Sequence, residues 1–365
     1  MVEVAPSGIL EASSEAPRLP VRTNTRDRIR KYIGQYGLIA VLLIMPVTFG
    51  LHDLATDGNL TRLGNNLVAG LSNGAIWALI ALGYTLVYGI IELINFAHGE
   101  VFMIGSLVTA AWFWGVIGLT EATATIPLIV GLLASLVVAM VTSGSLNVMI
   151  ERVAYRTLRT APKLAPLITA VGMSFILQNV GILWIGGSQE GVPELVDPQK
   201  ELFTIGGVVI HQGDVLAIAV TIPLVFLLTT FINQSRMGRA MRATAQDPEA
   251  ARLMGINVDT TISLTFLLGG LMAGAAGLVY ALYQTTIWYF QGFQAGLVAF
   301  TAAVMGGIGN LQGAVLGGFI IGIIQQTSDN RIGGEWTPAI VFAYLVLIMV
   351  FRPQGLLGEE TREAG

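Results

Sequence analysis

A stretch of 69 consecutive residues, from Thr260 through Ser328, contains no Asp, Glu, Lys, Arg or His. A water-soluble core of this size needs a polar covering, yet only 12% of the 365 residues are charged, against about 25% in soluble domains. A helix crosses a bilayer with about 20 residues, so this stretch alone is long enough for three crossings. The sequence therefore predicts an all-α polytopic membrane protein.

Apolar runs along the chain predict about ten transmembrane helices, within a range of eight to ten. The predicted spans cover about residues 36–51, 66–90, 101–119, 126–150, 164–186, 214–233, 262–284, 296–310, 313–328 and 336–352. The eighth and ninth are short enough to form a re-entrant or broken pair. A weak sequence similarity between Gly83–Tyr88 and Gly277–Tyr280 suggests that spans 2–5 recur as spans 7–10 with inverted orientation, which is a common architecture of transporters.

Three regions follow from this division of the chain. Residues 1–35 form an arm with a disordered start and a basic end, residues 36–352 form the membrane domain with a long polar segment at 235–261, and residues 353–365 form a polar tail. A cleaved signal peptide is the competing interpretation of the arm, but its basic residues lie far from Met1 and no A-x-A-like site follows Leu51.

Charge predicts the orientation of the chain. With both termini in the cytoplasm, the segments on that side hold 16 of the 19 Lys and Arg residues, as the positive-inside rule requires. The exceptions are Arg62, Lys200 and Arg331.

The polar segment 235–261 predicts a short capped helix. Asp247 is a suitable N-cap, Pro248 fits the first helical position, and Gly255 supplies the stop. Because so short a helix is marginal in water, a surface should hold it. That surface is either the lipid headgroups or a groove on a cytoplasmic motor protein, and the residues alone favour neither.

Several motifs carry a resemblance to a known family. The chain resembles, over about residues 60–357, the LivH-type permeases of branched-chain amino acid ABC importers. The motifs are the runs Asn73–Gly89, Ile94–Glu100, Glu151–Arg156, 235–261, Met305–Asn310 and Phe351–Gly355. The long N-terminal arm departs from the family pattern.

The resemblance implies a heteromeric importer in the bacterial inner membrane. Its partners would be a second, LivM-like permease, two cytoplasmic ABC ATPase subunits that hold ATP-Mg, and an extracytoplasmic solute-binding protein; this chain itself would be no enzyme and would carry no cofactor. Matched onto this sequence, the coupling element to the ATPases would comprise Asp247, Glu249, Ala250, Arg252, Leu253, Met254 and Gly255.

Polar residues within the predicted spans are amides and hydroxyls. The candidates to line a pathway for a neutral or zwitterionic solute are Ser72, Asn73, Thr85, Gln178 and Asn179, although each could instead form an interhelical hydrogen bond. Carboxylates such as Glu92 and Glu100 fall near predicted span ends, which argues against a transporter driven by an ion gradient.

Other functions find less support in the sequence. No G-x-x-x-x-G-K-[ST] motif and no cysteine occurs, and the three separated histidines predict no metal site. The Gly-rich run at 305–322 indicates close helix packing. A passive channel for a small neutral solute such as urea, and an ABC permease for urea or short amides, remain the alternatives; a membrane-embedded enzyme lacks a catalytic cluster.

Overall fold

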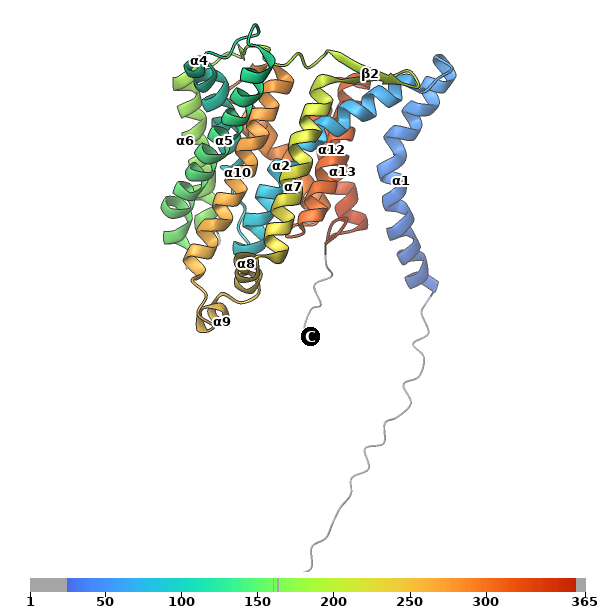
Figure 1. The fold of residues 1–365 in the computed structure, drawn as a ribbon. Coiled ribbons are helices and arrows are strands. Elements are labelled where there is room, and N and C mark those ends of the chain that lie inside the picture. Colours follow the sequence, from blue (N-terminus) through green and yellow to red (C-terminus); the bar gives the residue numbers. More distant parts are fainter. Residues whose placement is uncertain (1–24, 160, 163, 359–365) are drawn as a thin grey trace, which may run out of the picture.

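The chain is represented by a computed structural model that describes residues 25–159, 161–162 and 164–358 (Figure 1). The predicted disordered start of the arm and the end of the tail lie outside the described residues. The first helix, α1 (Thr25–Thr56), begins inside the predicted arm and therefore includes some of its basic residues.

The described part of the chain consists mainly of long helices, and this confirms the prediction of an all-α membrane protein. The helices after α1 are α2 (Thr61–Ile91), α3 (His98–Leu107), α4 (Trp114–Ile117), α5 (Thr125–Ile150), α6 (Leu164–Ile185), α7 (Gln212–Gln234), α8 (Arg236–Gln246), α9 (Pro248–Leu253), α10 (Val258–Gln284), α11 (Gln291–Gly306), α12 (Leu311–Arg331) and α13 (Thr337–Phe351). A π-helical turn, Val108–Phe113, joins α3 to α4, and another, Glu151–Tyr155, extends α5.

Each of the ten predicted spans coincides with a helix or a continuous helical run, but fewer meet the length and apolarity needed for a crossing. Six helical segments of the described chain do so. They are Thr61–Ile91, His98–Ile117, Thr125–Leu158, Leu164–Ile185, Gln212–Gln234 and Val258–Gln284. Ala40–Thr56 and Thr337–Phe351 are shorter apolar helices, and α11 has only 16 residues.

Short strands occupy the end of the bundle opposite α9 (Figure 1). Strands β2 (Glu201–Ile205) and β3 (Val208–His211) form an antiparallel hairpin, and β1 (Glu190–Gly191) pairs with β4 (Thr286–Ile287). The hairpin turn consists of Gly206 and Gly207, both with positive φ, as a two-residue hairpin turn favours.

Helix α2 lies at the centre of the bundle, buried over most of its length and packed against α12, α10, α11 and α7. Its contact with α12 is made by glycines, as the Gly-rich run predicted: a Cβ added to Gly322 would lie 2.4 Å from the Gly70 carbonyl oxygen. Outer helices expose apolar side chains instead; on α5, Ile126 is 77% and Val130 is 62% exposed. Such a surface is stable in lipid and not in water.

The same order of elements occurs twice around the centre. Helices α2 and α10 end at Glu92 and Thr285, the two non-glycine residues with positive φ in the described chain. After each, a non-helical segment leads into a short helix, α3 or α11. The first turns of these short helices touch, since a Cβ added to Gly99 would lie 2.2 Å from the Gly292 carbonyl oxygen. Helix α12 packs on α2 as α5 packs on α10.

Candidate functional site

The segment between α7 and α10 folds into two short helices at one end of the bundle (Figure 1). The Asp247 carboxylate accepts the backbone N–H of Glu249 at 2.9 Å and of Ala250 at 3.0 Å, which caps α9. Pro248 begins the helix, and Gly255 follows its end with a φ of 82°. The predicted capped helix is therefore confirmed as a local structure.

Helix α9 presents two large apolar side chains that nothing in the described chain covers. Leu253 is 88% and Met254 is 83% exposed, whereas Ala251 is buried. Ala250 and Arg252 are exposed as well. The rest of the described chain thus does not supply the surface expected to hold this helix, and α9 forms an exposed apolar tip.

Helix α8 connects this tip to the bundle. The Ser235 hydroxyl caps α8 by accepting the N–H of Gly238 at 2.9 Å, and Met241 is buried against the neighbouring helices. The outward side carries Arg236, Arg239 and Arg242, which are all exposed. Spaced three residues apart, these arginines form a basic stripe along one side of the helix.

The five candidate pathway residues do not meet at one site. Ser72 donates to the Val68 carbonyl at 3.0 Å, and Asn73 donates to Gln326 on α12 at 2.7 Å. On α6, Gln178 is buried, whereas the exposed Asn179 donates to its own helix.

Thr85 differs from the other candidates in its hydrogen bonding. Its hydroxyl is buried and has no hydrogen-bond partner in the described part of the chain, and it lines a chamber beside α8. The other buried candidates form the hydrogen bonds within or between helices that the sequence analysis gave as the alternative.

A buried carboxylate, Glu100, was missed by the sequence analysis, which placed it near the end of a span. Glu100 is fully buried, and its Oε1 accepts hydrogen bonds from Ser174 at 3.1 Å and from Gln178 at 2.9 Å. The reason is that α3 begins only after the chain has turned back into the bundle, where its first turn meets that of α11. The interior of the protein therefore does contain an ionisable group.

Two sets of ion pairs fasten the outer parts of the bundle. Arg331, expected in an outer loop, ends α12 and forms a buried ion pair with Asp53 of α1. At the α9 end, Arg159 contacts both Glu151 and Asp259, and so links the end of α5 to the start of α10.

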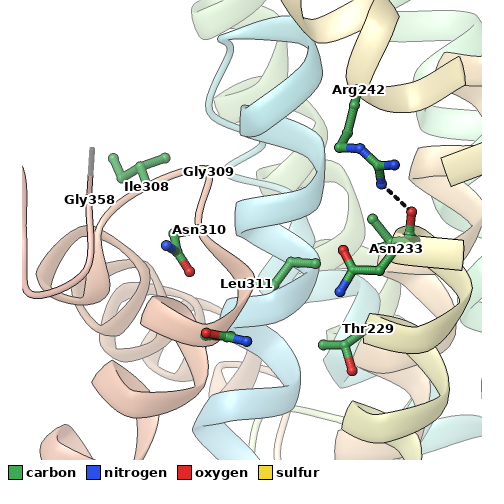
Figure 2. Close-up of a pocket in the computed structure, with 10 residues that line it drawn as sticks. Thr229, Asn233, Arg242, Ile308, Gly309, Asn310, Leu311 and Gly358 are labelled. Atoms are coloured by element: carbon green, nitrogen blue, oxygen red, sulfur yellow. Dashed lines mark hydrogen bonds between the residues drawn. The ribbon is translucent and has the colours of Figure 1, made fainter. Parts of the chain in front are cut away.

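A groove of about 550 Å³ opens between the end of α7 and the α11–α12 turn, with α2 behind it (Figure 2). Thr229 and Asn233 line one wall, and Asn310 lines the other. Arg242 of α8 also lines the groove and donates a hydrogen bond to the Ile232 carbonyl of α7. A second chamber of about 250 Å³ adjoins the groove and shares Arg242 with it.

These features define a class of protein: a polytopic helical membrane protein with a glycine-packed centre and an exposed apolar tip on a short capped helix. Residues 66–350 match the family model described as branched-chain amino acid transport system / permease component. The chain belongs to this family.

Individual relatives agree with the family match. The chain is 42% identical over 297 residues to the high-affinity branched-chain amino acid transport system permease protein BraD of Pseudomonas aeruginosa, covering 80% of this chain and 94% of BraD. It is 41% identical over 294 residues to the corresponding protein LivH of Escherichia coli, covering 79% and 93%.

A more distant relative and one solved structure extend the comparison. A probable LivH of Methanocaldococcus jannaschii is 27% identical over 292 residues, covering 78% of this chain and 89% of the relative. PsaBC from Streptococcus pneumoniae in complex with Fab matches 83% of this chain and 95% of its own at 13% identity, with a TM-score of 0.39. This structural similarity is too weak to assign a fold.

Proposed function

We propose that this chain is a permease subunit of an ABC importer that moves branched-chain amino acids across the bacterial inner membrane. The observation that carries the proposal is its 42% identity to BraD over 94% of that relative, whose name states this transport system. The chain would be no enzyme itself, because it contains no phosphate-binding motif; ATP and Mg²⁺ would be held by partner subunits.

The proposal includes ten membrane crossings, of which the second to fifth recur inverted as the seventh to tenth. The crossings would be α1, α2, the run from α3 to α4, α5, α6, α7 and α10 to α13. Support comes from the matching ends of α2 and α10 and from the touching first turns of α3 and α11. With both termini and α9 in the cytoplasm, the distribution of Lys and Arg follows the positive-inside rule.

Partners complete the proposed importer. The exposed tip of α9, with Leu253 and Met254, would insert into a groove on a cytoplasmic ATPase subunit, since an amphipathic helix binds such a groove through its apolar side chains. Asp247 and Gly255 would fix the two ends of this helix. A LivM-like permease would pair with this chain, and an extracytoplasmic solute-binding protein would deliver the amino acid.

Replacing Leu253 and Met254 together with Asp tests the docking. Membrane insertion should be unaffected, the ATPase subunits should no longer co-purify, and ATP-driven uptake of leucine should fall to background. Ile205→Asp is the control, because Ile205 is an exposed apolar residue (64%) on the hairpin at the opposite end. Full uptake with the double variant would refute the coupling role of α9.

The same uptake assay separates the alternatives. A urea or short-amide permease would take up labelled urea and not leucine, and a passive channel would work without ATP or the ATPase subunits. Leucine uptake that requires both supports the proposal over these two functions.

A further inference from the structure

The groove beside α8 has a positive charge that is not balanced within the described chain. Arg242 makes one hydrogen bond, to the Ile232 carbonyl, and no ion pair with another described residue. Arg236 and Arg239 on the same stripe have no ion pair there either. The residues that line the groove and its adjoining chamber include no Asp or Glu. The groove therefore attracts anions.

Hydrogen-bond donors face this charge across the groove. The N-terminus of α12 forms one wall through Asn310, Leu311 and Gln312. The Asn310 side chain caps Gly313, while the N–H groups of Leu311 and Gln312 belong to the first turn, which has no helical acceptor and carries the positive end of the helix dipole. The side chains of Gln312 and Asn233 are exposed and form no hydrogen bond with described residues.

The adjoining chamber contains a second, independent sign of a missing ligand. Thr85 is 1% exposed, and its hydroxyl has no hydrogen-bond partner among the described residues. A buried hydroxyl without a partner costs stability, and Thr85 lines the chamber that shares Arg242 with the groove. A ligand or its water in this chamber would satisfy it.

The two helices that form the walls of the groove, α7 and α12, change from polar at the groove to apolar beyond it. On α7, Asn233 and Thr229 lie on one helical stripe with Phe226 and Ile222, which are 67% and 58% exposed. On α12, the exposed Gln312 is followed one turn later by Leu316, which is 40% exposed. Polar groups thus lie at the ends of the helices, and apolar side chains continue from them toward the middle of the bundle.

We propose that this groove binds an anionic phospholipid, with its phosphate at Arg242 and the α12 N-terminus and its acyl chains along α7 and α12. The polar-to-apolar order of both walls matches a lipid and does not match a free phosphate ion, which has no apolar part. Basic pockets between membrane helices bind lipid headgroups in this way. The site is separate from the docking tip of α9 and does not depend on which solute is transported.

Native mass spectrometry of the purified protein tests the site with phosphatidylglycerol and phosphatidylcholine as probes. The wild type should retain phosphatidylglycerol in preference to phosphatidylcholine. Arg242→Gln should weaken this binding about fivefold, the effect of one basic residue near a lipid phosphate, and Asn233→Trp should weaken it by filling the groove. Arg252→Gln, which removes the same charge from exposed α9, is the control and should bind as the wild type does.

Three outcomes would overturn the proposal. They are unchanged phosphatidylglycerol binding in the folded Arg242→Gln and Asn233→Trp proteins, equal retention of phosphatidylcholine by the wild type, and displacement of phosphatidylglycerol by excess inorganic phosphate. The last result would assign the groove to a free anion. Asn233→Trp retains the arginine, so it tests the groove even if Arg242→Gln does not fold.

Discussion

The close contact between α2 and α12 allows the free-energy cost of adding a single methyl group to be estimated. A Cβ added to Gly322 of α12 would lie 2.3 Å from the Gly74 backbone nitrogen and 2.4 Å from the Gly70 carbonyl oxygen, both on α2. Ordinary contacts lie at about 3.5–4.0 Å, and backbone atoms cannot rotate away as a side chain can. Gly322→Ala therefore requires α2 and α12 to move apart by roughly 1 Å.

The free-energy cost of this separation comes from van der Waals contacts that the two helices lose. A gap of 0.5–1 Å forfeits about a quarter to a half of each contact worth ~0.1–0.2 kcal/mol, and roughly fifty atom pairs across two closely packed helices then lose about 3 kcal/mol. Alanine recovers about 1 kcal/mol of helix propensity relative to glycine. The net destabilisation is therefore about 2 kcal/mol.

Thermal unfolding of the purified protein in detergent measures this effect. Gly322→Ala should lower Tm, whereas Gly172→Ala should leave Tm unchanged or raise it slightly, because Gly172 is exposed on α6 and a Cβ there would meet no atom within 4 Å. If Gly322→Ala melts at or above the temperature of Gly172→Ala, the backbone contact between α2 and α12 is not as close as described.

Two further variants test buried charge. Arg331→Met leaves Asp53 buried without its partner and should destabilise the protein by about 3–5 kcal/mol; the double variant with Asp53→Leu should recover most of this loss in the same melting experiment. Glu100→Gln keeps an oxygen that accepts from Ser174 and Gln178, so stability should change by less than about 1 kcal/mol. ATP-driven uptake in proteoliposomes should remain and should be indifferent to a proton gradient; uptake by the wild type that collapses with the gradient would contradict this.

Much of the fold could be predicted from local features of the sequence. The charge-free stretch from Thr260 to Ser328 predicted membrane helices, and each long apolar run forms a helix in the structure, because backbone groups in lipid must be satisfied within a helix. Asp247, Pro248 and Gly255 predicted the ends of α9 correctly, since helix capping depends on the residues of the cap itself.

Features that depend on contacts between distant segments of the chain could not be predicted from the sequence in the same way. The segment before Glu100 carries no signal that it turns back into the bundle, so a residue next to a predicted span was taken as lying at its end. Ser72, Asn73, Thr85, Gln178 and Asn179 were selected by residue type, and type alone does not distinguish a helix-to-helix hydrogen bond from a cavity wall. The groove at Arg242 joins residues from α2, α7, α8 and α12, and this proximity appears only in the folded chain.

The backbone contact between α2 and α12 limits how this protein can change shape. Two helices that touch through Gly74 and Gly322 have no room to slide or rotate against each other. Helix α10, which begins just after α9, packs on α2 as well. In the proposed importer, a displacement of α9 would reach α2 through α10, and the close contact through Gly322 would make α12 move together with α2.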